Sequence, residues 1–598
     1  MREPGRTVAR CLFLVLTIAA LGACGGGGSG GGGSTTAVSP PPSTPAPTPP
    51  PPPEPPPEPA ALTPAAAARF LSQATFGPDT DSIDALVNTG LDAWFTSELT
   101  KPASLHLEDV LDRFPADGSF LDESGNPLPQ LVYAASDSFW EKAISADDQL
   151  RQRMAFALSQ IMVVSSQSDL ARAPQIVAAY MDTLTTGAFG NFRDLIENVT
   201  YSPAMGVYLT YLRNQKADPA TGRVPDENYA RELLQLFTLG LVELNPDGTP
   251  AQGSDGAPVE LFDNDDITGL AKVFTGLSFS GTAFATPLGA IPYESFYQPL
   301  SMFNTFHSFE EKSFLNTTIP ANFGGVESID RALDAIFAHP NVGPFLSRQL
   351  IQRFVTSAPA PDYVARVAAA FDSGDYELPS GTVVGSGNRG DLGATLAAIL
   401  FDQNARGDSA DTNTGFGKLR EPVIRFTHWA RAFKVNSADA RNERLLRDTS
   451  SPELLGQHPY RSPSVFNFYR PGYIAPGTET GAAQLTAPEL QIANASTVMG
   501  YPNFLTIYAL GRSPKVSPAL PSAFAVDYAT EKALATDPDA LLDHLDLLLT
   551  HGTLREETRE RIRDALNVVN PGTDAGRLGR AQLASVMVMT SPEYVVLR

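Results

Sequence analysis

The sequence predicts a mainly α-helical protein with long irregular loops and few short strands. Residues 148–164 carry apolar side chains at a helical spacing, and residues 226–241 form the clearest helical segment of the chain. There Asp226 can cap the first turn, and Gly240 stands near the end. Strand-like patterns are few and short, and residues 242–244, beside a predicted turn, are one candidate. These observations together favour a large multi-helix fold.

The remaining helices follow in order along the chain. Thr63 can cap a helix that starts with Pro64, because proline suits the first helical position. Asp265 and Asp266 can cap another that continues to about residue 275. Periodic apolar patterns predict further helices at 173–186, 190–196, 328–338, 342–356, 392–401, 418–434, 486–499, 538–550, 555–568 and 579–590.

The first residues are typical of an export signal. Three arginines precede the apolar run 11–23, which is shorter than the roughly 20 residues that span a membrane. Small residues then lead to Cys24, and this arrangement resembles the lipobox of bacterial lipoproteins. The resemblance implies lipidation of Cys24 and a body held in the bacterial cell envelope, with sorting to an outer membrane if one exists. The alternative is an ordinary secretory signal that contains a cysteine.

Composition divides the chain into three parts. Residues 1–23 form the predicted lipoprotein signal peptide, residues 24–60 form a Gly/Ser- and Pro-rich stalk, and residues 61–598 form the helical body, with two subdomains as an open alternative. Such a stalk is expected to lack a packed structure and to act as a spacer.

Charge and cysteine content exclude several classes of function. The formal net charge is −23, and it becomes still more negative when the arginine-rich signal is removed. This argues against nucleic acid as a partner and against an electrostatic grip on anionic lipid. Only Cys24 would remain in the mature chain, so it offers no internal disulfide and no thiolate ligand. No motif specifies a cofactor or a metal, and both stay unknown.

Two groups of charged residues could carry chemistry. Glu227, Arg231 and Glu232 lie at the start of the clearest helix, where they could clamp a phosphate, a sulfate or a cation, or form ordinary ion pairs. His307 and Lys312 share a segment without periodicity, predicted as a loop. They could act as an acid–base and electrostatic pair, or they could serve local structure.

A third group lies in the proline-rich stretch 457–473. His458, Arg461, Asn467 and Tyr469 stand among its aromatic residues. They could line a binding pocket, or they could satisfy the backbone of a buried loop.

Several stretches together resemble a bacterial family known as domain of unknown function 1800. They are 68–78, 188–209, 225–241, 265–279, 306–316, 420–433 and 457–473. The resemblance implies a largely helical exported protein without an established reaction, and a secreted protein of sulfatase-like fold as a partner. Gln160 and Phe237 stand where many relatives have histidine, so two potential metal ligands are absent.

Two hypotheses of function follow. The first is a lipid-anchored accessory or binding module that works with the sulfatase-like partner or with an envelope polymer. The second is an envelope hydrolase or transferase acting on an anionic or glycan substrate. We expect the enzyme to bring His307 and Lys312 into one cleft with Glu227 or Arg231.

Overall fold

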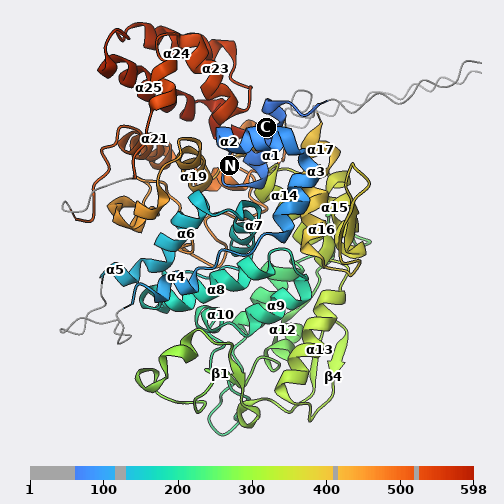
Figure 1. Ribbon diagram of the computed structural model, residues 1–598. Helices are drawn as coiled ribbons and strands as arrows, with labels where there is room; N and C mark the ends of the chain where they lie inside the picture. The colour runs from blue at the N-terminus through green and yellow to red at the C-terminus, as the bar shows by residue number, and fades with distance from the viewer. Residues whose placement is uncertain (1–60, 115–128, 408–414, 518–523) are drawn as a thin grey trace, which may run out of the picture. The chain divides into compact units, whose positions relative to one another are not determined.

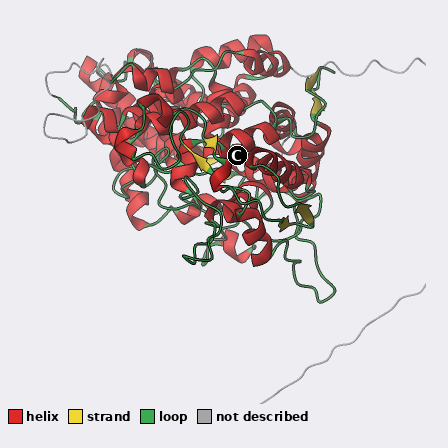
Figure 2. Ribbon diagram, turned by 90° about the horizontal axis from the view of Figure 1, so that it is seen from below, coloured by secondary structure: helices red, strands yellow, loops and turns green. Residues whose placement is uncertain are grey.

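Helices carry most of the regular structure, which confirms the predicted mainly α fold (Figures 1 and 2). The computed structural model describes residues 61–114, 129–407, 415–517 and 524–598. Their contacts group Ala61–Arg598 into one unit. Within these residues no helix is both long and apolar enough to cross a membrane.

The first half of the described chain is built from short helices. They are α1 (Pro64–Ala74), α2 (Thr80–Thr89), α3 (Leu91–Thr100), α4 (Leu107–Leu111), α5 (Pro129–Val132), α6 (Ala134–Ser145), α7 (Gln149–Ser159), η1 (Asp169–Arg172), α8 (Pro174–Gly187), α9 (Phe192–Thr200), α10 (Pro203–Tyr208), α11 (Asn228–Glu232), η2 (Leu233–Thr238), α12 (Asn264–Ala271), η3 (Leu288–Ala290), η4 (Tyr293–Phe296) and η5 (Asn304–Phe306).

The second half continues in the same way and ends in helices that pack on one another. It contains α13 (Gly325–Ala338), α14 (Val342–Phe354), α15 (Pro361–Ser373), α16 (Leu392–Phe401), α17 (Gln403–Arg406), α19 (Pro422–Ala432), η6 (Ser437–Asn442), η7 (Arg444–Arg447), α20 (Glu479–Ala482), η8 (Pro488–Gln491), α21 (Ala495–Ala509), α22 (Ala529–Leu534), α23 (Pro538–Leu545), η9 (Asp546–Thr550), α24 (Glu556–Asn567), α25 (Asp574–Met589) and α26 (Pro592–Val595). Helices α23, α24 and α25 contact one another, as the red ribbons of Figure 1 show.

Within the part of the chain that the structure describes, the strands form four antiparallel pairs of two or three residues each. The pairs are β1 (Leu277–Ser278) with β2 (Ser301–Met302), β3 (Lys312–Phe314) with β4 (Thr317–Ile319), β5 (Asp375–Glu377) with β6 (Val383–Gly385), and β7 (Lys418–Leu419) with β8 (Val596–Leu597). In the last pair Lys418 lies opposite Leu597, so the end of the chain is fixed beside the start of α19.

One large hydrophobic cluster connects the helices from α1 to α26. Phe70, Trp140, Trp429 and Tyr594 are fully buried in it. Aromatic rings connect distant elements. Trp140 of α6, for example, packs edge to face on Phe426 of α19, with ring centroids 5.6 Å apart. This shared core holds α1–α3 against α19, the elements that form the cleft described below.

The structure confirms most helices and corrects several boundaries. Thr63 caps α1 by accepting from the Ala66 N–H at 3.2 Å, as expected. Helix α12 is capped by Asp263, not by Asp265 or Asp266. The Asp263 carboxylate accepts from the N–H groups of Asp265 and Asp266, and the Asp266 carboxylate accepts from the Asp263 N–H.

Two predicted elements differ more strongly. Residues 486–499 do not form one helix, since η8 ends at Gln491 and α21 starts only at Ala495 after the Asn494 cap. The predicted strand 242–244 has only isolated bridges from Val242 and Leu244.

The predicted helix 226–241 is α-helical only to Glu232 and then becomes the π-helical turn η2. In this turn the Thr238 hydroxyl donates to the Leu233 carbonyl at 2.6 Å. Phe237, one of the two positions that lack the expected histidine, lies in this turn.

Candidate functional site

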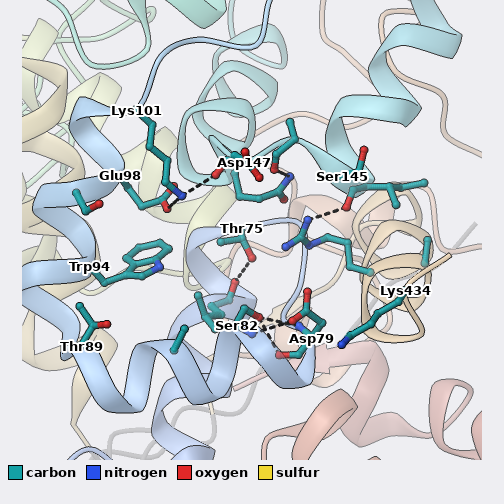
Figure 3. A pocket seen from close by; sticks show the side chains of 18 of the residues that line it. Thr75, Asp79, Ser82, Thr89, Trp94, Glu98, Lys101, Ser145, Asp147 and Lys434 are labelled. Atoms are coloured by element: carbon teal, nitrogen blue, oxygen red, sulfur yellow. Dashed lines mark hydrogen bonds and ion pairs between the residues drawn. The ribbon is translucent and has the colours of Figure 1, made fainter. Parts of the chain in front are cut away.

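An open cleft of about 560 Å³ lies beside the first three helices and the end of α19. Its volume is within the range of about 300–1,000 Å³ that is common for small-molecule sites. In Figure 3, Glu98 and Lys101 lie at the top, Asp79 and Ser82 at the bottom, and Trp94 and Lys434 on opposite sides.

A tight connection between two helices forms one wall. Gly90 ends α2 and begins α3 with a φ of +83°, a backbone conformation that residues other than glycine rarely adopt. At the other end of α2, Asp79 accepts from the Ser82 N–H at 2.8 Å, and the Asp79 N–H donates to the Ser82 hydroxyl at 2.9 Å. This capping box fixes the lower edge of the cleft.

A buried carboxylate lies at the upper edge. Glu98 is only 3% exposed, and burial raises its pKa although the contact with Lys101 acts in the opposite direction. The Lys101 ammonium bonds the Glu98 carboxylate and also donates to the Asp147 carbonyl at 2.7 Å. The pair therefore places both signs of charge at the cleft, and the Lys101 bond to Asp147 fixes it to the segment between α6 and α7.

Arg431 connects α19 to the opposite walls. Its Nε donates to the Gly77 carbonyl at 2.6 Å, and its Nη1 donates to the Ile144 carbonyl at 2.7 Å. Burial lowers the pKa of Arg431 to about 10, while Asp79 and Glu98 act to raise it, so the guanidinium stays charged at neutral pH. Arg431 thus places a fixed positive charge between two carboxylates.

Trp94 supplies the aromatic surface of the cleft. Its ring packs edge to face on Phe70, with centroids 5.4 Å apart and planes at 87°. The side chain is half-buried, and its indole N–H has no hydrogen-bond partner among the described residues. An indole with one packed edge and one open edge is a common element of binding surfaces.

These features suit recognition better than proton transfer. Glu98, Lys101 and Arg431 are engaged with one another or with backbone carbonyls, Lys434 pairs with Asp81, and the lining contains no histidine or cysteine. A ligand would meet a preformed surface with an aromatic ring and both signs of charge.

His307 and Lys312, the predicted catalytic residues, lie close together in the interior. Both are 0% exposed, and Lys312 belongs to β3 rather than to the predicted loop. The Nδ1 of His307 lies 2.9 Å from the Thr275 carbonyl, and Lys312 donates to the Glu310 carbonyl at 3.1 Å. Burial lowers the pKa of His307 to about 4 and that of Lys312 to about 8.

The charged residues at the start of α11 lie beside α12. Glu227 pairs with Arg231 at 3.3 Å and accepts from the Thr268 hydroxyl at 2.9 Å. The charge of Arg231 also acts on Glu232, which is buried and whose Oε2 has no hydrogen-bond partner among the described residues. Burial raises the pKa of Glu232.

The third predicted group is mostly enclosed. His458, Asn467 and Tyr469 are buried, whereas Arg461 pairs at the surface with Asp448 at 2.9 Å. Only His458 and Asn467 share a small hollow. Burial lowers the pKa of His458 to about 4.

A buried ionic cluster beside this segment was not predicted from the sequence. Glu421 and Glu489 both approach Lys418, with N–O distances of 3.9 and 3.4 Å. Gln160 and Gln457 donate to the Glu421 carboxylate, the latter at 2.6 Å. Burial acts to raise the pKa of Glu421, but Lys418 and nearby Arg153 bring it below its ordinary value. The cluster joins two of the family-like segments.

The remaining expectations concern the lipid anchor, the stalk and a possible metal. Cys24, the signal peptide and the stalk lie outside the described residues. Among the described residues, no three His, Cys, Asp or Glu side chains gather as a metal site would need.

The fold and the cleft define a mainly helical protein with an open polar cleft and enclosed ionic clusters. The profile of the family described as Protein of unknown function (DUF1800) matches residues 69–596, and the chain belongs to this family. Neither the curated proteins nor the solved structures gave a match.

Proposed function

We propose that this protein is a lipid-anchored component of the bacterial cell envelope and that its helical body is a binding module for an envelope polymer. Cys24 would carry the lipid, and residues 25–60 would act as the spacer. The observation that carries the proposal is the open cleft with Trp94 on its wall, next to charged groups of both signs.

The chemistry of the cleft indicates the kind of polymer. Trp94 can stack on the apolar face of a sugar ring, Arg431 and Lys101 can bind carboxylates, and Asp147 can bind an amine or an amide. A polymer of amino sugars that carries short peptides has all of these groups. Peptidoglycan is therefore the proposed ligand.

The enzyme hypothesis receives less support from the same geometry. A hydrolase or transferase would need its substrate to reach His307 and Lys312, yet both side chains have no exposed surface. The Glu227–Arg231 pair lies against a different residue of α12, since Thr268 contacts the pair while Gly269 packs on β3. A binding role needs no such rearrangement.

Co-sedimentation tests the proposal with the full chain in mild detergent. The protein should pellet with insoluble peptidoglycan sacculi, and Trp94→Ala should weaken binding about tenfold. Leu288→Ala is the control, because Leu288 is 60% exposed and does not line the cleft. A wild-type protein that stays in the supernatant would contradict the proposal.

The same preparation can reveal a protein partner. A secreted protein of sulfatase-like fold, the partner suggested by the family resemblance, should then be recovered from envelope extract together with the wild-type chain. Its absence would leave the polymer as the ligand and remove the partner from the proposal.

A further inference from the structure

A second cleft, of about 490 Å³, lies along α8 and α9, which run side by side in Figure 1. Its lining lacks the cationic side chains that line the first cleft, which is called the Trp94 cleft below. It contains no lysine, arginine or histidine, whereas hydroxyl, amide and carboxylate groups are abundant. The cleft therefore offers no counter-charge to an anionic ligand.

Several polar groups of this cleft are not used by the protein. Asp194, Asn198 and Thr186 are exposed, and their side chains have no hydrogen bond or ion pair within the part of the chain that the structure describes. The hydroxyls of Tyr201 and Tyr297 are likewise without a partner there. In the Trp94 cleft, by contrast, Glu98, Lys101 and Arg431 are all engaged.

Other residues make the cleft rigid. Asp182 accepts from the backbone N–H groups of His106 and Leu107, at 2.5 and 3.0 Å, and so ties α8 to the start of α4. Tyr293 packs edge to face on Tyr297, with centroids 5.8 Å apart, and thereby supports the second aromatic ring. The free groups therefore project from fixed elements, which reduces the entropy lost when a ligand binds.

Aromatic rings beside free hydroxyl, amide and carboxylate groups, without a cation, match a saccharide. The C–H face of a sugar ring packs on a tyrosine, and its hydroxyls donate to carboxylate and amide oxygens. We propose that the α8–α9 cleft is a second ligand site that binds an uncharged oligosaccharide. Tyr297 would be the stacking platform, and Asp194 and Asn198 would be the polar contacts. This site does not depend on the proposed role of the Trp94 cleft.

Isothermal titration calorimetry of the full chain in mild detergent tests the inference. The probes are cellotetraose and maltotetraose, which lack the amino sugars proposed as ligands of the Trp94 cleft, at concentrations up to about 10 mM. At least one should bind, and the anionic tetragalacturonate should bind at least about tenfold more weakly because Asp194 repels it. No heat with any neutral probe, or equal affinity for tetragalacturonate, would overturn the proposal.

Variants locate the site and separate it from the first cleft. Asn198→Ala and Tyr297→Ala should each weaken binding about threefold to tenfold, as expected for the loss of one polar contact or one stacking ring. Gln298→Ala is the matched control, since Gln298 is exposed next to Tyr297 but does not line the cleft.

Trp94→Ala should leave the saccharide affinity unchanged, so the two proposals can fail independently. If Tyr297→Ala lowers the melting temperature, Asn198→Ala alone decides. Wild-type affinity in Asn198→Ala would refute the assignment of the site.

Discussion

Gln457 donates from its Nε2 to the carboxylate of Glu421 at 2.6 Å, inside a cluster that is closed to solvent. Gln160 donates to the same carboxylate from α7's end. Segments far apart in the chain are thus joined at one buried charge, which balances Lys418 and Arg153. Loss of the Glu421 charge should therefore disturb several buried partners at once.

Glu421→Gln should destabilise the protein strongly. The substitution removes a buried negative charge and leaves Lys418 with weaker compensation, which typically costs about 3–5 kcal/mol. Urea unfolding followed by circular dichroism measures the change. Glu327→Gln is the control, because Glu327 pairs with Arg331 at the surface and should contribute less than about 1 kcal/mol. Equal effects of the two substitutions would refute the role of the cluster.

Gly269→Ala should also be severely destabilising. A Cβ at Gly269 would lie 1.8 Å from the Ser313 carbonyl oxygen, so α12 would have to move away from β3. We expect a loss of several kcal/mol, at least about 2, as for other overpacked sites. Gly289→Ala, where no atom lies within 4 Å of the added Cβ, should have little effect. Similar melting temperatures for both variants would show that α12 and β3 are not in such close contact.

His307 should make stability depend on pH. Its folded pKa is about 4, lowered by burial and by the charges of Lys312 and Lys216, and its ordinary value is 6.5. Between these values the unfolded chain binds a proton that the folded chain does not, so stability falls as the pH falls from 6.5 to 4.

His307→Gln isolates this contribution. The stability of the wild type relative to the variant should decrease by up to about 3 kcal/mol between pH 7 and pH 4. Urea midpoints measured for both proteins across this range give the difference. Parallel pH profiles would mean that His307 is not buried as a neutral imidazole.

Cys24→Ser tests the anchor. Without the thiol no lipid can be attached, and several acyl chains, each contributing about 0.8 kcal/mol per buried CH₂, would be lost. Fractionation should then show the protein released from the membrane fraction or left unprocessed. Unchanged membrane retention would exclude lipidation at this cysteine.

The helical fold was predictable because capping residues and apolar spacing act locally. Thr63 with Pro64 marks the start of α1, and Gly240 follows the end of the η2 turn with a φ of +83°. A predicted boundary was wrong where several acidic residues could cap the same helix. Asp263, which precedes the predicted Asp265 and Asp266, is the cap of α12. The sequence predicted a few short strands but not the positions of those in the structure, because two or three residues give no periodic pattern.

The clefts were harder to predict, since their residues come from distant segments. Trp94 and Glu98 belong to α3, whereas Arg431 ends α19, and only the shared core brings them together. The i,i+3 spacing of Glu98 and Lys101 was the one local signal. The lack of periodicity predicted a loop for His307 and Lys312, but it could not show that both side chains are buried.

Tryptophan emission gives the most direct test of the proposed polymer-binding role. The chain has three tryptophans, and Trp140 and Trp429 are fully buried while Trp94 lines the cleft. Titration of the full chain with soluble peptidoglycan fragments should therefore change the emission in a saturable way, and Trp94→Phe should abolish the change. An unaltered wild-type emission, or the same response in Trp94→Phe, would contradict binding in this cleft.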